Sequence, residues 1–216
     1  MKRLIIYDLD GTLVDTLQDI ANAANHMLGE LRMPPRPATE IRRYIGRGLH
    51  ELVKNCLKTT EPSLLERGTK IYRAFYTQHL LDHSRLYPGA EAVLDYFKAR
   101  RQAVITNKPN PYSRDMLKGL GIADYFLEIV GGNSDYPKKP DPAALLAIMS
   151  REQVAGSDTL FIGDSPVDIE TGRKAGAATI ALTHGLVDEE ELIAAAPDVL
   201  VPNFTALLDA VKQRGW

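Results

Sequence analysis

The sequence predicts an α/β protein: a parallel β-sheet covered by helices on both sides, with an inserted helical domain. Short apolar runs of β-forming residues recur at 3–7, 103–106, 126–130, 159–163 and 178–182. Helical patterns separate the later runs, at 90–101, 113–119, 142–150 and 168–175. Strands that alternate with helices in this way are typical of a parallel sheet, whose strands are apolar on both faces. Residues 188–216 are expected to form the helices that complete the core, without a chemical role.

The interval 15–84 has no convincing strand, which predicts a separate helical domain. Its first helix begins near residue 17 and ends at Pro34-Pro35, because proline cannot continue a helix. A second helix is expected to be capped at Thr39, and two more are expected over 49–57 and 64–79. We therefore expect a catalytic core of residues 1–14 and 85–216 and an α-helical cap domain of residues 15–84.

Composition limits the possible partners and cellular setting. The 216 residues are 44% hydrophobic and 25% charged, which is typical of a globular protein and excludes disorder and coiled coil. A formal charge of -2 offers no basic face for nucleic acid and no polybasic membrane anchor. No apolar stretch approaches the roughly 18 residues of a membrane span. The single Cys56 is expected in the core of a reduced, cytoplasmic protein.

The first polar segment of interest is Asp8-Leu9-Asp10-Gly11-Thr12, which follows the first predicted strand. Ligands of open α/β sheets bind outside the carboxyl ends of the strands. Two carboxylates two residues apart repel each other unless a cation or a difference in protonation relieves the repulsion. Taken alone, the pair fits a turn before glycine equally well.

Three more polar segments follow later strands. Thr106-Asn107-Lys108 offers a hydroxyl and an amide that can donate to phosphate oxygens, although Thr is also a common helix cap. Lys138-Lys139-Pro140-Asp141-Pro142 presents lysines on extended backbone or, equally, a solvated pair. Gly163-Asp164-Ser165-Pro166-Val167-Asp168 adds a third carboxylate, and Asp168 is also placed to cap the next helix. Together, the four segments predict a site for a divalent cation and a phosphate.

These segments resemble the four motifs of the haloacid dehalogenase (HAD) superfamily, and the resemblance spans nearly the whole chain. It implies a Rossmann-like core with a small α-helical cap inserted after the first motif. Within the superfamily, Thr106-Asn107-Lys108-Pro109, Gly131-Gly132 and Leu182-Thr183-His184-Gly185 resemble the bacterial phosphoglycolate phosphatase branch. The implied activity is hydrolysis of a small phosphorylated metabolite such as 2-phosphoglycolate.

The resemblance also implies roles for single residues. Asp8 is expected to attack phosphorus and form an aspartyl-phosphate, while Asp10 protonates the leaving group and later deprotonates water. Mg²⁺ would be held by Asp8, the backbone carbonyl of Asp10, and Asp164. Lys139 would stabilise charge on the transferring phosphoryl group. The remaining expected contacts are the Thr106 hydroxyl and backbone N–H groups near Leu9, Gly11 and Asn107 on the phosphate, and Asp168 on Lys139 or a metal-bound water.

Substrate choice is expected to depend on the cap, because the core recognises only phosphate. The best candidate is Arg47, which lies between Gly46 and Gly48 and could bind a carboxylate bidentately. The alternative is that Arg47 belongs to a solvated helix face together with Arg42 and Arg43.

Other activities fit parts of the same pattern. A phosphomutase of the β-phosphoglucomutase type shares the nucleophile, acid, metal and cap, and pyrophosphatase or nucleotidase branches also remain open. Dehalogenation is disfavoured because the dehalogenases proper lack an acid at the position of Asp10. A signalling receiver domain would not carry a helical insertion after its first strand. A serine hydrolase built on Ser165 would need a partner that orients His184.

Overall fold

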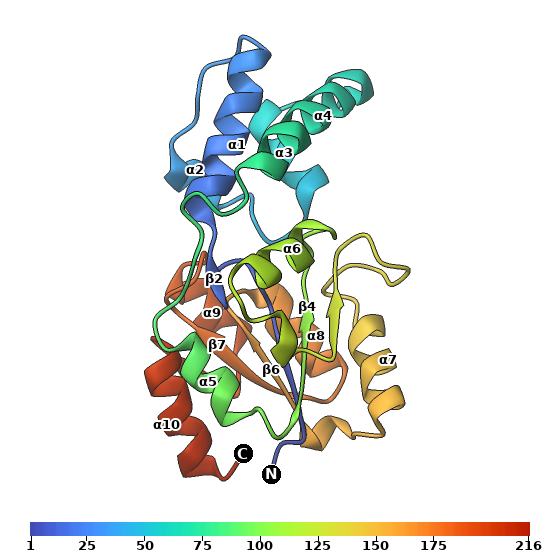
Figure 1. Cartoon of the computed structure of the whole chain (residues 1–216), viewed down its shortest axis with the longest axis vertical. Coiled ribbons are helices and arrows are strands. Elements are labelled where there is room, and N and C mark those ends of the chain that lie inside the picture. Colours follow the sequence, from blue (N-terminus) through green and yellow to red (C-terminus); the bar gives the residue numbers. More distant parts are fainter.

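The computed structural model describes residues 1–216 and contains a six-stranded parallel sheet, which confirms the predicted α/β fold (Figure 1). The strand order is β5-β4-β1-β6-β7-β8. The strands are β1 Leu4–Tyr7, β4 Arg101–Ile105, β5 Glu128–Val130, β6 Thr159–Gly163, β7 Ala178–Leu182 and β8 Val199–Val201. The predicted runs therefore correspond to five of the six strands.

Strand β1 lies in the middle of the sheet. Leu4 pairs with Arg101 of β4 on one side and with Thr159 of β6 on the other. All four residues of β1 are fully buried, because helices cover both faces of the sheet. This double coverage explains why the strand is a continuous apolar run and does not alternate with polar residues.

Six helices cover the sheet, three on each face. Helices α5 (Ala90–Tyr96), α6 (Tyr112–Gly119) and α10 (Phe204–Arg214) pack in the large apolar cluster that contains Ile5 and Tyr7. On the other face, α7 (Ala143–Glu152) packs against Leu4 and Ile6, and α8 (Pro166–Lys174) and α9 (Glu189–Ala195) contact Ala181. Alternate side chains of β1 therefore point into different apolar clusters, Ile5 and Tyr7 on one face of the sheet and Leu4 and Ile6 on the other.

Four helices form a unit at one end of the molecule, beyond the sheet (Figure 1). They are α1 Leu17–Glu30, α2 Ala38–Arg42, α3 Leu49–Leu57 and α4 Pro62–Gln78. The chain enters this helical unit through β2 (Val14–Asp15) and leaves it through β3 (Arg85–Leu86), and these two strands pair antiparallel. The unit therefore joins the core through a narrow two-stranded ribbon.

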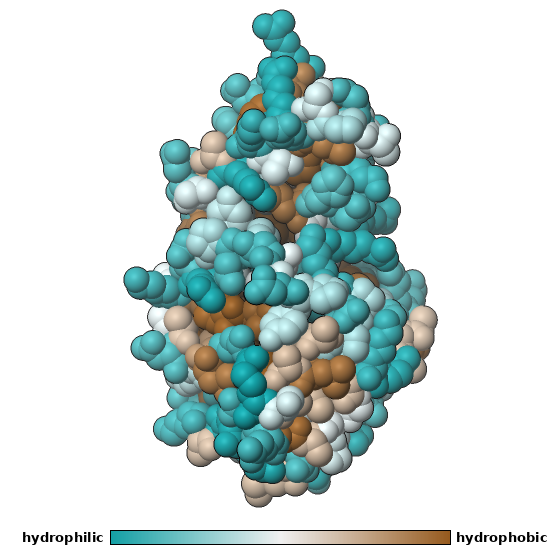
Figure 2. All heavy atoms as spheres, turned by 90° about the vertical axis from the view of Figure 1, so that its right-hand side faces the viewer, coloured by the Kyte–Doolittle hydropathy of each residue, from teal (hydrophilic) through white to brown (hydrophobic).

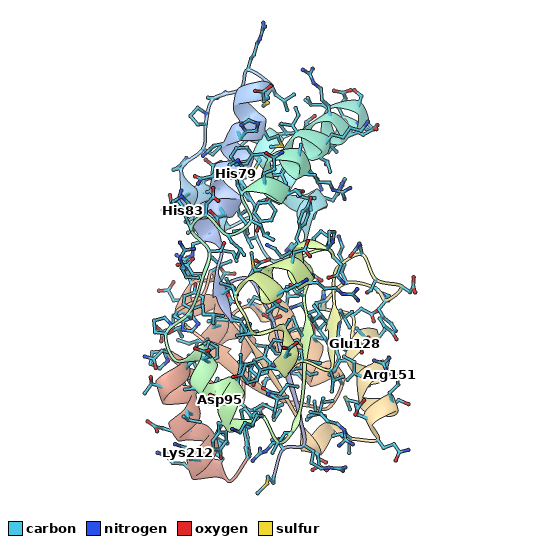
Figure 3. The ribbon with its side chains drawn as sticks, in the orientation of Figure 1. His79, His83, Asp95, Glu128, Arg151 and Lys212 are labelled. Atoms are coloured by element: carbon cyan, nitrogen blue, oxygen red, sulfur yellow. The ribbon has the colours of Figure 1, made fainter.

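A buried carboxylate fixes the base of the helical unit. Asp19 of α1 accepts hydrogen bonds from the backbone N–H groups of His83 and Ser84 and from the Ser84 hydroxyl, at 2.7 to 3.0 Å. Figure 3 shows His83 on the segment that returns from α4 toward the sheet. These bonds tie the incoming and outgoing segments together.

Three sequence-based expectations need correction. The tail was expected to be helical, but residues 199–201 form strand β8, which is too short to produce a periodic pattern. Asp15 belongs to β2, although no strand was expected in the interval 15–84. Thr39 lies inside the first turn of α2 and does not cap it. The residue at the N-cap is Pro37: its backbone is extended, and its carbonyl accepts the first helical bonds, from Glu40 and Ile41.

The surface is largely hydrophilic, with small separated hydrophobic patches on the face shown in Figure 2. None of the helices has the length and apolar character needed to cross a bilayer. Cys56 is fully buried in α3, and burial raises the pKa of its thiol to about 11, as expected for a core residue.

Candidate active site

The structure brings the four predicted segments together at the carboxyl ends of β1, β4, β5 and β6. Asp8 and Asp10 follow β1, and Thr106 to Lys108 follow β4. Lys139 lies in the long loop after β5, and Asp164 follows β6. Neighbouring parallel strands end at the same edge of the sheet, so residues up to 156 positions apart in the chain become neighbours.

Lys139 lies between two carboxylates. Its ammonium nitrogen is 2.9 Å from Asp8 Oδ1 and 2.6 Å from Asp168 Oδ1, and all three side chains are buried. Burial alone would lower the pKa of Lys139, but the carboxylates of Asp168 and Asp8 outweigh it and raise the pKa. Lys139 is therefore held as a cation beside the predicted nucleophile.

Asp168 positions Lys139 and caps a helix at the same time. Its Oδ1 binds Lys139, while its Oδ2 accepts hydrogen bonds from the backbone N–H groups of Asp164 and Ser165 and from the Ser165 hydroxyl. Both expected uses of this residue, helix capping and contact with Lys139, occur together. Asp168 Oδ2 thus has three donors, and its Oδ1 is paired with the Lys139 ammonium.

The carboxyl groups of Asp8 and Asp164 are destabilised in their charged form. Burial raises the pKa of Asp8 to about 7 against the opposing effect of Lys139. Burial, with further contributions from Asp168 and Asp8, raises the pKa of Asp164 well above its ordinary value. One carboxylate oxygen from each of Asp8, Asp164 and Asp168 lies within 4.8 Å of the other two. Such a cluster favours a cation that neutralises it.

The available oxygens fit a hard divalent cation. Asp8 Oδ2 has no hydrogen-bond partner, and each Asp164 oxygen accepts only one bond, from Thr12 Oγ1 at 2.6 Å or from the Leu186 N–H at 2.8 Å. No N–H donates to the Asp10 carbonyl oxygen. A Cβ atom at Gly11 would overlap the Asp164 carboxylate, so glycine is required for this approach.

Backbone donors that face the site differ in part from those expected. The N–H of Leu9 donates to Asp8 Oδ1, and the N–H of Gly11 donates to the Val14 carbonyl. By contrast, the N–H groups of Asp10 and Asn107 have no partner. The Thr106 hydroxyl accepts from the Lys108 N–H at 3.2 Å, which leaves its own proton available. Free donors thus lie on the segments after β1 and β4.

The Asn107 side chain is part of the scaffold. Its Nδ2 donates to the carbonyls of Gly46 and Lys139, and its Oδ1 accepts from the Lys139 N–H at 3.0 Å. The amide therefore holds the Lys139 segment in place and also contacts the helical unit. Its functional groups are already used, so only its backbone N–H can bind a ligand.

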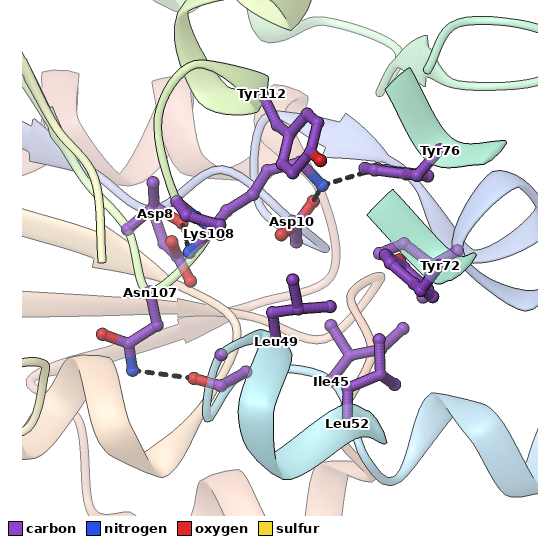
Figure 4. A pocket seen from close by; sticks show the side chains of 15 residues that line it. Asp8, Asp10, Ile45, Leu49, Leu52, Tyr72, Tyr76, Asn107, Lys108 and Tyr112 are labelled. Carbon is purple, nitrogen blue, oxygen red and sulfur yellow. Dashed lines mark hydrogen bonds and ion pairs between the residues drawn. The ribbon is translucent and has the colours of Figure 1, made fainter. Parts of the chain in front are cut away.

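Lys108 is the residue that sequence reasoning missed. Its ammonium nitrogen lies 2.9 Å from Asp10 Oδ1 and 2.6 Å from the Tyr76 hydroxyl, and the side chain is only 5% exposed (Figure 4). The sequence placed Lys108 beside Asn107 in a polar loop, where a lysine is normally solvated. Its contact with Tyr76 of α4 depends on how the helical unit packs, which local pattern does not indicate.

A small cavity of about 50 Å³ opens between the core and the helical unit (Figure 4). Asp8, Asp10, Thr106 and Lys108 line it from the core, and apolar side chains of the helical unit line the opposite wall. Arg47 does not line the cavity: it is exposed and makes no hydrogen bond or ion pair, although Gly46 and Gly48 on either side do line it. His50 is also exposed.

The geometry does not fit a serine hydrolase. Ser165 Oγ donates to Asp168, and His184 lies 3.2 Å from the Thr12 carbonyl while its ring stacks on Tyr87. Burial lowers the pKa of His184. Histidine and serine therefore have separate structural partners and do not form a nucleophile–base pair.

The comparisons with known proteins agree with the fold. The family model described as haloacid dehalogenase-like hydrolase matches residues 5–182, so the chain belongs to this family. It is 34% identical to a phosphoglycolate phosphatase of Vibrio parahaemolyticus, covering 97% of this chain and 96% of that protein. It is 33% identical to a phosphoglycolate phosphatase of Pseudomonas putida, covering 96% of this chain and 79% of that protein. The crystal structure of a predicted phosphoglycolate phosphatase from Haemophilus somnus has a TM-score of 0.93 at 29% identity, covering 97% and 98% of the two chains.

Proposed function

We propose that this protein is a Mg²⁺-dependent phosphate monoester hydrolase that acts through an aspartyl-phosphate on 2-phosphoglycolate. The observation that carries the proposal is the state of Asp8: one of its oxygens is paired with Lys139, the other has no partner, and Asp8 lines the cavity together with Asp10. The names of the relatives support the choice of substrate. The proposed setting is the cytoplasm, which agrees with a free thiol at Cys56.

The first half of the reaction transfers the phosphoryl group to Asp8. An Asp8 carboxylate oxygen forms a bond to phosphorus as the bond from phosphorus to the leaving oxygen breaks. Asp10 gives its proton to that oxygen, so glycolate leaves with a neutral hydroxyl. In the second half, Asp10 takes a proton from water, whose oxygen attacks phosphorus and releases phosphate and the free Asp8 carboxylate.

The residues around Asp8 stabilise the charge that develops on the phosphoryl oxygens. Lys139 supplies a fixed positive charge, and the N–H groups of Asp10 and Asn107 with the Thr106 hydroxyl supply the free donors. Asp8, the Asp10 carbonyl and Asp164 are the proposed ligands of Mg²⁺, whose bound charge would allow a phosphate dianion to approach the carboxylate. Asp168 acts through Lys139 by fixing its position.

The proposal is tested by measuring inorganic phosphate released from phosphoglycolate, sugar phosphates, nucleotides and pyrophosphate, with and without Mg²⁺. We expect Mg²⁺-dependent release with phosphoglycolate preferred. A phosphomutase would instead convert sugar phosphates with little release of phosphate. The Asp8→Asn variant should lose turnover and phosphoenzyme formation, whereas Asp115→Asn, an exposed change on α6, should keep both. Normal turnover by Asp8→Asn would overturn the mechanism.

A further inference from the structure

We propose that Lys108 binds the anionic group on the leaving half of the substrate, and that the protein thereby selects phosphorylated short-chain carboxylic acids. The inference rests on the proposed phosphatase function and adds a residue that determines specificity. It begins from position, because the Lys108 ammonium lies 2.9 Å from Asp10 Oδ1. Asp10 is the proposed acid for the leaving oxygen, so groups attached to that oxygen lie close to Lys108.

The hydrogen bonds of Lys108 leave one donor for a ligand. An ammonium group has three N–H donors. Two have partners, Asp10 Oδ1 and the Tyr76 hydroxyl, and the third has none. The side chain is 5% exposed and lines the cavity. A buried donor of a charged group without a partner is costly, and a carboxylate oxygen in the cavity would satisfy it.

Charge within the cavity points to the same role. Lys108 is the only basic residue among the fifteen that line the cavity; Arg47 is exposed outside it, and Lys139 is already paired with Asp8 and Asp168. The opposite wall is formed by Ile20, Ile45, Leu49 and Leu52. An ammonium–carboxylate pair is stronger beside apolar side chains than in water, since the local dielectric is lower. Asp10 Oδ2 has no hydrogen-bond partner and stays available to the leaving oxygen.

The position of Lys108 favours a short acid. Lys108 and Asp10 line the same small cavity and are in direct contact. In glycolate the carboxylate carbon is two covalent bonds from the leaving oxygen. This short separation matches the direct contact between Asp10, the proposed acid, and the Lys108 ammonium. Tyr76 belongs to α4, so the Lys108 position is complete only when the helical unit packs against the core as it does here.

The test compares two substrates of equal chain length, phosphoglycolate and 2-hydroxyethyl phosphate, which carries a neutral hydroxyl in place of the carboxylate. In Lys108→Met the ratio of the two kcat/KM values should fall by about 10- to 100-fold relative to the wild type, the effect of one hydrogen bond to a charged group. Within one preparation this ratio does not depend on the folded fraction. Lys118→Met removes an exposed lysine on α6 and should leave the ratio unchanged.

The outcomes separate the two proposals. If the wild type releases phosphate from neither substrate, the proposed function fails and this inference fails with it. If the wild type prefers phosphoglycolate and Lys108→Met loses activity equally on both substrates, Lys108 serves only Asp10 and the inference alone is overturned. Should Lys108→Met be inactive on both, calorimetric binding of phosphoglycolate to Asp8→Asn and to the double variant decides. A loss of affinity of about 10-fold or more supports the inference, and equal affinities overturn it.

Discussion

Arg42 of the helical unit donates a hydrogen bond from Nε to the carbonyl oxygen of Leu186 at 2.6 Å. The N–H of Leu186 in turn donates to Asp164 Oδ2 at 2.8 Å. Arg42 also lies 3.5 Å from Asp188, which flanks the same loop. One side chain from α2 therefore holds the loop that positions a proposed metal ligand.

This relationship predicts that Arg42→Ala weakens Mg²⁺ binding without touching the metal site. Freed from Arg42, the loop should hold the Asp164 carboxylate less firmly, and the Mg²⁺ concentration for half-maximal activity should rise roughly 3- to 10-fold, the cost of about one hydrogen bond. The increase in Tm on adding Mg²⁺ should shrink in parallel. Arg43→Ala, an exposed neighbour, serves as the control. Unchanged Mg²⁺ dependence in Arg42→Ala would contradict the coupling.

A second prediction concerns Arg47. Gly46 and Gly48 both have positive φ, at 102° and 89°, so the backbone around Arg47 adopts conformations that favour glycine. The carboxylate-binding role expected for Arg47 from the sequence requires this loop to turn inward, and it predicts that Arg47→Ala raises KM for phosphoglycolate much more than KM for an uncharged aryl phosphate. The exposed position of Arg47 outside the cavity, with Lys108 as the carboxylate-binding cation, predicts equal effects instead. Steady-state kinetics on both substrates measure the difference. Equal effects on both substrates would rule out a carboxylate-binding role.

A third prediction follows from the raised pKa of Asp8. Burial moves this pKa from 3.8 to about 7. Between these values the folded state binds a proton that the unfolded state has lost, so the contribution of Asp8 to the free energy of unfolding falls as pH rises. Asn cannot titrate. Without divalent cations, Asp8→Asn should therefore gain about 2–3 kcal/mol over the wild type between pH 5 and pH 8.

Urea unfolding of both proteins in a chelator, at the two pH values, measures this gain. Asp115→Asn provides the control, because Asp115 is exposed and its replacement should shift stability equally at both pH values. The same difference between Asp8→Asn and wild type at pH 5 and pH 8 would show that Asp8 is not destabilised in its charged form. Saturating Mg²⁺ should reverse the trend for the wild type, since the cation favours the carboxylate.

A fourth prediction concerns Asp19, which is 1% exposed and accepts hydrogen bonds from three donors. Asp19→Ala should lower the free energy of unfolding by about 2–4 kcal/mol, because it leaves buried N–H groups of residues 83 and 84 without partners. Ser84→Ala removes only the hydroxyl donor and should cost about 1 kcal/mol. Urea denaturation compares the two. A loss for Asp19→Ala no larger than that for Ser84→Ala would contradict the assigned role.

Sequence pattern predicted the central strands well because their signal is local. Each residue of β1 is buried on whichever face it points to, so the whole strand is apolar. Strand β8 has only three residues, two of them half-buried, and its pairing with Ile180 to Leu182 depends on packing between distant segments. A run that short cannot be distinguished from a buried turn by periodicity.

In the candidate site, too, local sequence signals could be predicted and contacts between distant segments could not. Asp8, Lys139 and Asp164 could be predicted because each follows a strand that ends at one edge of the sheet. The pairing of Lys108 with Tyr76, and of Arg42 with Leu186, joins residues 32 and 144 positions apart across the two parts of the molecule. Such contacts depend on how the helical unit packs. The sequence therefore indicates Arg47 as the arginine that reaches the core, whereas in the structure Arg42 makes these contacts.

The position of β1 in the sheet affects the order in which the chain can fold during synthesis. Strand β1 can pair on both of its edges only after Arg101 of β4 and then Thr159 of β6 have been synthesised, because Leu4 pairs with both. The second partner strand is available only once residue 163 has been made. The contacts between α1 and α4, in contrast, are complete once residue 78 has emerged. The helical unit can therefore form while β1, the strand that precedes the proposed nucleophile Asp8, still has no partner, and until then this apolar strand is exposed and prone to aggregation.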